Sequence, residues 1–191
     1  MHQFIFFFKY LKYKLTSKYR RGYSVHSPFL YNLIRNVLYK NTNYYALDEI
    51  ADLRNDLLHC NDNILVTDLG SGSKVMKSNI RKIKHITKYS AISEKFGEML
   101  FRLIEHYKPH AILELGTSLG IGTLYLAMPK SKAEVYTIEG CRCRSEIALK
   151  SFQIAEAKNI HLSTGDFDEV LPGLLSGAGT PGLIFIDGNH R

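Results

Sequence analysis

The strongest constraint on the fold is a regular alternation of strand-like and helix-like segments in the second half of the chain. Four short apolar runs lie at 111–115, 133–139, 160–164 and 183–187. The stretches between them carry apolar residues every three or four positions, as amphipathic helices do. Strands that alternate with helices in this way form βαβ units and pair in parallel. We therefore predict an α/β fold with a Rossmann-like, doubly wound parallel sheet over residues 91–191.

Two glycine-rich stretches compete as the binding loop for a nucleotide-like cofactor. Residues 64–73 read ILVTDLGSGS and residues 111–123 read AILELGTSLGIGT, and each is an apolar run followed by an acid and glycines. Such a loop needs a strand before it, a helix after it and an acid at the end of the next strand. The second stretch meets all three conditions, because Glu139 closes the following strand roughly twenty residues beyond Gly116.

The glycine spacing of the second stretch narrows the choice of cofactor. Gly116, Gly120 and Gly122 are spaced G-x-x-x-G-x-G, unlike the G-x-G-x-x-G of NAD-binding loops, and no Walker lysine follows. The first stretch is followed by a basic segment without a later strand that ends in an acid. We interpret the first stretch as a structural turn and keep open a role as an active-site cover that contributes Lys or Ser.

Residues 1–90 differ from the rest in charge, and we expect them to form a mainly helical, Tyr-rich extension. Ser27 and Pro28 suit the N-cap and the first position of a helix. No acid precedes Asp48, whereas eight basic residues do. These are Lys9, Lys12, Lys14, Lys18, Arg20, Arg21, Arg35 and Lys40. Basic patches with interleaved tyrosines can bind nucleic acid or an anionic surface, although more of them are solvated faces.

The first residues of the chain and the three cysteines indicate where in the cell the protein would be found. The apolar run FIFFF is too short for a signal-peptide core or a membrane span, so we expect no transmembrane segment. We favour a first helix that packs on its own domain or on a dimer mate, and an interfacial helix stays open. Cys60, Cys141 and Cys143 form no disulfide or zinc pattern, which predicts free thiols in a cytoplasmic protein.

Several motifs in the second half recur together and in a fixed order. They are ELGTSLGIG, YTIEG, STGDF with VLP, and IFIDGNH. In this order they resemble class I S-adenosylmethionine-dependent methyltransferases, in particular the catechol and caffeoyl-CoA O-methyltransferase branch and its FIDGxH relatives. The resemblance covers residues 90–191 and implies S-adenosylmethionine as cofactor and O-methylation of a small molecule. Residues 1–90 resemble only the leader of a bacterial set of uncharacterised methyltransferase-like proteins.

The resemblance implies roles for individual residues. Glu114 would help to hold the methionine amino end of the cofactor, and Glu139 would accept both ribose hydroxyls. Asp166 and Phe167 would border the adenine. Asp187 would be catalytic and, in the metal-dependent branch, a ligand of a divalent metal such as Mg²⁺; His190 is the second catalytic candidate. The remaining cofactor-binding candidates are Gly116, Thr117, Ser118, Gly120 and Gly140.

Each candidate also has a plainer interpretation. Glu114 and Glu139 would then be exposed carboxylates at strand ends. Asp166 would only cap the helix that follows it. Asp187 would form a turn, and His190 lies among the last residues, where disorder is common.

The resemblance also implies a sheet ordered 3-2-1-4-5-7-6, whereas the chain stops just after its fourth predicted strand. We therefore expect a truncated product with an incomplete sheet, ordered 3-2-1-4, that binds cofactor weakly or not at all and does not turn over. The exposed edge of the fourth strand would favour self-association, and a homodimer is left open. Two other functions stay open: an RNA or protein methyltransferase, which the basic first third favours, and a non-catalytic nucleotide-binding or interaction module.

Overall fold

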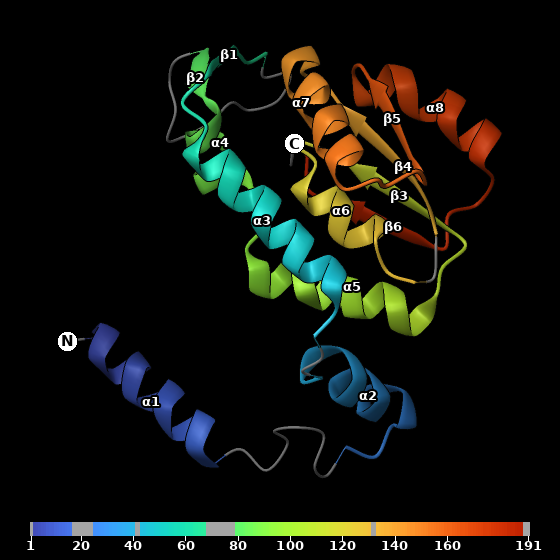
Figure 1. Cartoon of the computed structure of the whole chain (residues 1–191). Helices are drawn as coiled ribbons and strands as arrows, with labels where there is room; N and C mark the ends of the chain where they lie inside the picture. The colour runs from blue at the N-terminus through green and yellow to red at the C-terminus, as the bar shows by residue number, and fades with distance from the viewer. Residues whose placement is uncertain (1, 17–24, 41–42, 68–78, 131–132, 189–191) are drawn as a thin grey trace. The chain divides into compact units, whose positions relative to one another are not determined.

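The computed structural model describes residues 2–16, 25–40, 43–67, 79–130 and 133–188 (Figure 1). The chain divides into two units, Met1–Thr42 and Asn43–Arg191. The boundary that we expected at residue 90 therefore falls inside the second unit. Among the described helices, none has the length and apolar character needed to cross a bilayer.

The first unit is helical in its described parts. Helix α1 spans His2–Thr16, and α2 spans Pro28–Leu33 and continues as the π-helical segment η2, Ile34–Leu38. The Ser27 hydroxyl accepts a hydrogen bond of 3.4 Å from the Leu30 N–H, and Pro28 occupies the first turn. The helix start that we predicted from these two residues is confirmed.

A four-stranded parallel sheet forms the centre of the second unit. Its strands are β3 (Ala111–Leu115), β4 (Glu134–Glu139), β5 (Ile160–Thr164) and β6 (Leu183–Ile186). The order is β5-β4-β3-β6, and every neighbouring pair is parallel. This is the predicted order 3-2-1-4. Since the chain fills one side of β3 first and then crosses to the other side, the topological switch point lies between β3 and β6.

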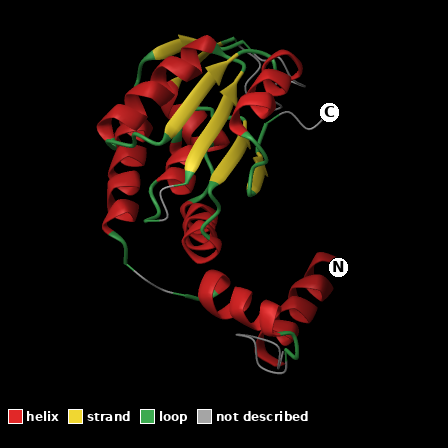
Figure 2. Ribbon diagram, turned by 90° about the vertical axis from the view of Figure 1, so that its right-hand side faces the viewer, coloured by secondary structure: helices red, strands yellow, loops and turns green. Residues whose placement is uncertain are grey.

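Helices cover both faces of this sheet, so the predicted doubly wound arrangement is confirmed (Figure 2). On one face lie α5 (Glu94–Tyr107), α6 (Ile121–Ala127) and α7 (Arg142–Ile154), and α8 (Phe167–Ala178) lies on the other. The main core is on the first face, where Ile104, Ile112, Leu126 and Val135 are fully buried together. Their burial fixes the two central strands against α5 and α6.

Residues 43–90 pack on this domain. Helix α3 (Tyr45–His59) lies against α6 and α4 (Ile83–Ser90), and β1 (Asn63–Leu65) pairs with β2 (Ile80–Lys82) in an antiparallel hairpin. The buried Arg54 of α3 donates a hydrogen bond of 2.5 Å to the Ile92 carbonyl at the start of the parallel-sheet region. The helices fit the mainly helical extension that we expected over residues 1–90, whereas the hairpin was not expected.

Candidate cofactor site

The loop between β3 and α6 turns sharply because three of its residues have positive φ angles. Gly116 has a φ of 106° and Gly120 of 87°, and Ser118 adopts the left-handed region at 52°. A Cβ on Gly116 would lie 2.7 Å from the Gly188 N atom, after β6, and one on Gly120 would lie 2.6 Å from the Phe152 ring. Only glycine fits at these two positions. The loop therefore passes close to the end of β6 at the switch point.

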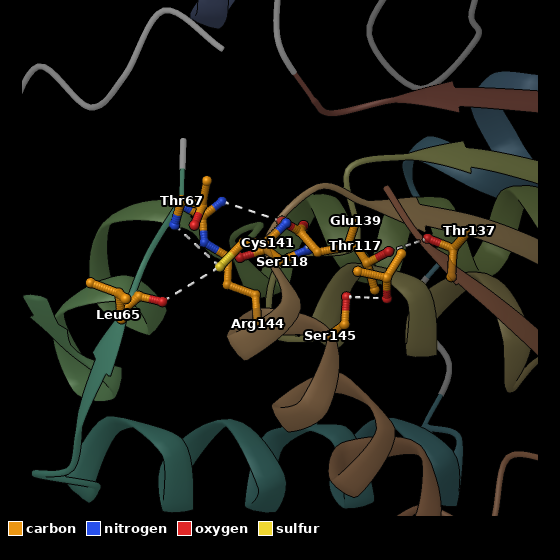
Figure 3. A network of polar contacts seen from close by, with 10 residues as sticks. Leu65, Thr67, Thr117, Ser118, Thr137, Glu139, Cys141, Arg144 and Ser145 are labelled. Atoms are coloured by element: carbon orange, nitrogen blue, oxygen red, sulfur yellow. Dashed lines mark hydrogen bonds and ion pairs between the residues drawn. The ribbon is translucent and has the colours of Figure 1, made fainter. Parts of the chain in front are cut away.

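Glu139, at the carboxyl end of β4, holds this loop in place through hydrogen bonds. One of its oxygens, Oε2, accepts a 2.7 Å hydrogen bond from the Ser118 N–H, and Oε1 accepts one of 2.9 Å from the Cys141 N–H. Arg144 of α7 lies 3.6 Å from Oε1 (Figure 3). Gly140 lies between β4 and α7 in the sequence. Because the carboxylate is almost fully buried, the plainer interpretation of Glu139 as an exposed strand-end acid is wrong.

Glu114 of β3 is completely buried beneath the same loop. Its Oε2 accepts hydrogen bonds from the hydroxyls of Thr123, at 2.5 Å, and Thr137, at 2.6 Å. The Thr117 hydroxyl lies 2.6 Å from that of Thr137, so the loop joins this network. Burial raises the pKa of Glu114 to about 7, opposed by the two hydroxyl bonds and reinforced by the nearby negative charges of Asp187 and Glu139. The plainer interpretation of Glu114 as exposed is also wrong.

The first glycine-rich stretch begins beside the second. After β1, the Thr67 N–H donates a hydrogen bond to Cys141 Sγ at 3.4 Å, and that thiol donates to the Leu65 carbonyl at 3.7 Å (Figure 3). Val66 is buried in one cluster with Cys141 and with Leu119 of the second loop. Residues 68–73 lie outside the described residues. Because β1 belongs to an antiparallel hairpin, the first stretch does not leave a strand of the parallel sheet.

The start of α8 borders the end of β6. The Asp166 carboxylate accepts a 2.9 Å hydrogen bond from the Asp168 N–H, so it caps α8, as the plainer interpretation has it. The next side chain, Phe167, packs on Gly188, since a Cβ on that glycine would lie 2.7 Å from the ring. Asp187 is exposed beside it, and its N–H donates to the Leu115 carbonyl at 3.0 Å. These residues form the second side of the switch point.

No metal centre is formed within the described part of the chain. Among those residues no group of three or more His, Cys, Asp or Glu side chains is arranged to hold a metal ion. His190, the second catalytic candidate, lies outside the described residues. We therefore derive no chemical step through a divalent metal.

Four residues of the site were not predicted from the sequence. Thr123 and Thr137 bind Glu114, while Cys141 and Arg144 contact Glu139 or its neighbours. The parallel register places Thr137 directly beside Glu114, so a prediction of the β3–β4 pairing would have found it. For Arg144 the available signal was a basic residue in the first turn of the helix after Glu139.

The fold is shared with solved methyltransferase structures. The chain is 19% identical, with a TM-score of 0.56, to an S-adenosylhomocysteine-bound methyltransferase, PaMTH1, from Podospora anserina. It is 19% identical, with a TM-score of 0.51, to an O-methyltransferase from Bacillus cereus in complex with S-adenosylhomocysteine. It is 22% identical, with a TM-score of 0.52, to the O-methyltransferase TomG from Streptomyces achromogenes in complex with S-adenosylmethionine. No protein-family model matches the chain.

The match covers most of this chain and about half of each of those proteins. It includes 79%, 77% and 78% of this chain, in the same order, and 53%, 56% and 55% of the other proteins. At these identities the comparison establishes the fold. The expected resemblance is thus confirmed for the architecture of the sheet and its helices.

Proposed function

We propose that this chain binds S-adenosylmethionine at the β3–α6 loop, with the weak affinity expected from the sequence, and belongs to a methyltransferase that acts on an oxygen atom of a small molecule. The observation that carries the proposal is the contact between Glu139 and the Ser118 N–H, 2.7 Å long. It holds a buried carboxylate and a glycine loop side by side at the carboxyl ends of two adjacent parallel strands. This is where open α/β sheets bind ligands with a ribose.

The residues at the switch point fit such a ligand. Gly116 and Gly188 let the loop pack directly on the end of β6, since a Cβ on Gly116 would lie 2.7 Å from the Gly188 N atom, so the backbone on both sides of the switch point is held together. Glu139 would hold the ribose hydroxyls, with Gly140 next to it. Asp166 and Phe167 would border the adenine, and Glu114 would sit under the methionine amino group. Thr117, Ser118 and Gly120 supply the loop backbone.

When bound, S-adenosylmethionine supplies an electrophilic methyl group on a sulfonium. The chain's part in methyl transfer is then to hold the donor, exclude water and help to remove the proton of the acceptor hydroxyl. Asp187, exposed at the end of β6, is our candidate to accept that proton. His190 stays a candidate for the same role. The three cysteines are free thiols, which fits our proposal of a cytoplasmic protein.

The test is calorimetric titration of S-adenosylhomocysteine, with NAD as comparator. Both ligands contain adenosine, so a preference reports the rest of the site. We expect S-adenosylhomocysteine to bind at least about tenfold more tightly than NAD. Glu139→Gln should abolish this binding, whereas Glu134→Gln, at the exposed opposite end of the same strand, should preserve it.

A second variant distinguishes a loss of binding from a loss of folding. Phe167 is half-buried and outside the main core, so Phe167→Ala should keep the thermal unfolding midpoint within a few degrees while it weakens binding. Equal affinity for both ligands, or unchanged binding by a folded Glu139→Gln variant, would refute the proposal.

A further inference from the structure

The first unit carries the whole excess of positive charge. The chain has 25 Lys and Arg and 18 Asp and Glu, and eight of the basic residues but none of the acids precede Asp48. The remaining 17 basic residues nearly balance the 18 acids. Any anionic surface that the protein contacts would therefore be drawn to the first unit and not to the methyltransferase-like domain.

Helix α1 presents apolar and basic side chains together. Every side chain from Phe8 to Thr16 is exposed. Phe8, Leu11 and Leu15 follow one another at spacings of three and four residues and therefore share one side of the helix. Lys12 and Lys14 project on either side of this stripe. Long lysine side chains beside an apolar stripe can reach polar headgroups while the stripe enters an apolar layer.

The second helical segment of the first unit has a similar surface. Leu30, Tyr31 and Leu38 of α2 and its continuation are exposed, as is Tyr39 just after them, and only Val37 is buried there among the described residues. The Arg35 guanidinium lies 5.7 Å from the centre of the Tyr31 ring. Tyrosine and arginine side chains of this kind are favoured at the interface between lipid and water.

We propose that the first unit binds an anionic phospholipid surface, with α1 lying in the interface. Its 15 residues are too few to span a bilayer, so it would lie along the surface. Three partners could cover this surface: a second copy of the chain, RNA or an anionic lipid surface. The charge and the apolar stripe of the first unit distinguish between them. A second copy would bring one acid-free unit against another, and RNA would not require the aliphatic Leu11 and Leu15. An anionic lipid surface satisfies both the lysines and the stripe.

The experiment is flotation of the full chain with lipid vesicles. One set is phosphatidylcholine alone, and the other contains about 30% phosphatidylglycerol, so only the surface charge differs. We expect binding to the anionic vesicles to be at least about tenfold stronger and to weaken as salt rises from about 0.1 M to about 0.5 M. The double variant Leu11→Glu/Leu15→Glu should lose it.

The matched control is Leu149→Glu/Ile154→Glu, which alters two exposed apolar residues of α7 in the second unit. It should float like the unaltered protein. Equal flotation with both vesicle types, or equal loss in both double variants, would overturn the proposal. Preferential binding of an RNA oligonucleotide, or a dimer that the α1 variant dissociates without any vesicle binding, would overturn it too. None of these outcomes depends on the cofactor site.

Discussion

Helices α6 and α8 both follow a strand of the parallel sheet, yet they are held very differently. Six of the seven residues of α6 are buried, whereas none of the described side chains of α8 is buried. The loop before α6 is thus both core and proposed binding site. The segment before α8 can change with little effect on the core. Substitutions on the α6 side will change stability and binding together, and those on the α8 side, apart from the cap of the helix, should change binding with a smaller loss of stability.

The largest contrast should come from removing one leucine side chain on each helix. Leu124 of α6 is 0% exposed and Leu175 of α8 is 40% exposed. Leu124→Ala leaves a cavity in the core and should lower the free energy of unfolding by about 2–5 kcal/mol. Leu175→Ala should change it by less than about 0.5 kcal/mol. Urea unfolding of both variants measures the difference, and similar losses would show that α8 is as tightly packed as α6.

The buried Glu114 should make stability depend on pH. Its pKa rises from an ordinary 4.5 to about 7 in the folded protein because burial disfavours the charge. Between these values the folded state holds a proton that the unfolded state has lost, so stability falls as the pH rises. The fall should total about 3 kcal/mol and level off above the folded pKa.

Glu114→Gln keeps an acceptor for Thr123 and Thr137 but cannot titrate. Its unfolding free energy should therefore lack the fall that the unaltered protein shows between the unfolded pKa of 4.5 and the folded pKa of about 7. Glu146→Gln, on the exposed surface of α7, should keep the fall of the unaltered protein. A pH profile identical in all three proteins would mean that Glu114 stays charged.

Features that depend on neighbouring residues in the sequence could be predicted, whereas contacts between residues far apart in the sequence could not. The four strands and their parallel pairing could be predicted because apolar runs and helical spacing are local patterns, whereas the order of the strands was implied by the resemblance. The cap at Asp166 was open to both interpretations, and the structure supports the plainer one without testing the other.

The contacts that organise the site could not be predicted locally. Thr137 reaches Glu114 only through the β3–β4 register, and Thr67 reaches Cys141 across 74 positions of sequence. The latter contact brings the N-terminal hairpin to the loop that follows Glu139. Val66 of the first glycine-rich stretch also lies in one buried cluster with Leu119 of the second, so the two stretches that the sequence offers as alternatives are neighbours in the fold.

A smaller effect should separate the two roles of Asp166. Its hydrogen bond to the Asp168 N–H caps α8, so Asp166→Ala should cost about 1 kcal/mol. Asp166→Ser restores a capping hydroxyl but shortens the side chain, and should recover most of that stability. If Asp166 also contacts adenine, the Ser variant will be as stable as the unaltered protein and still bind S-adenosylhomocysteine more weakly. Full recovery of both properties would leave Asp166 as a cap only.

The smallest effect is expected at the edge of the sheet. Ile138, Leu115 and Ile186 are register partners and lie in one row across β4, β3 and β6. Along this row exposure rises from 0% at Ile138 to 56% at Ile186. Ile138→Thr would bury an additional hydroxyl and should cost several times more than Ile186→Thr, which should stay within about 0.5 kcal/mol.

The thermal unfolding midpoint, measured at several protein concentrations, tests whether a second copy covers Ile186. An exposed strand edge can pair with another chain, and a second copy on β6 would bury Ile186. In that case Ile186→Thr would destabilise the protein by more than about 1 kcal/mol, and the thermal unfolding midpoint would rise with protein concentration. A small effect that does not vary with concentration would instead mean that this end of the row faces solvent. The steep gradient of burial from β4 to β6 would then be a property of the single chain.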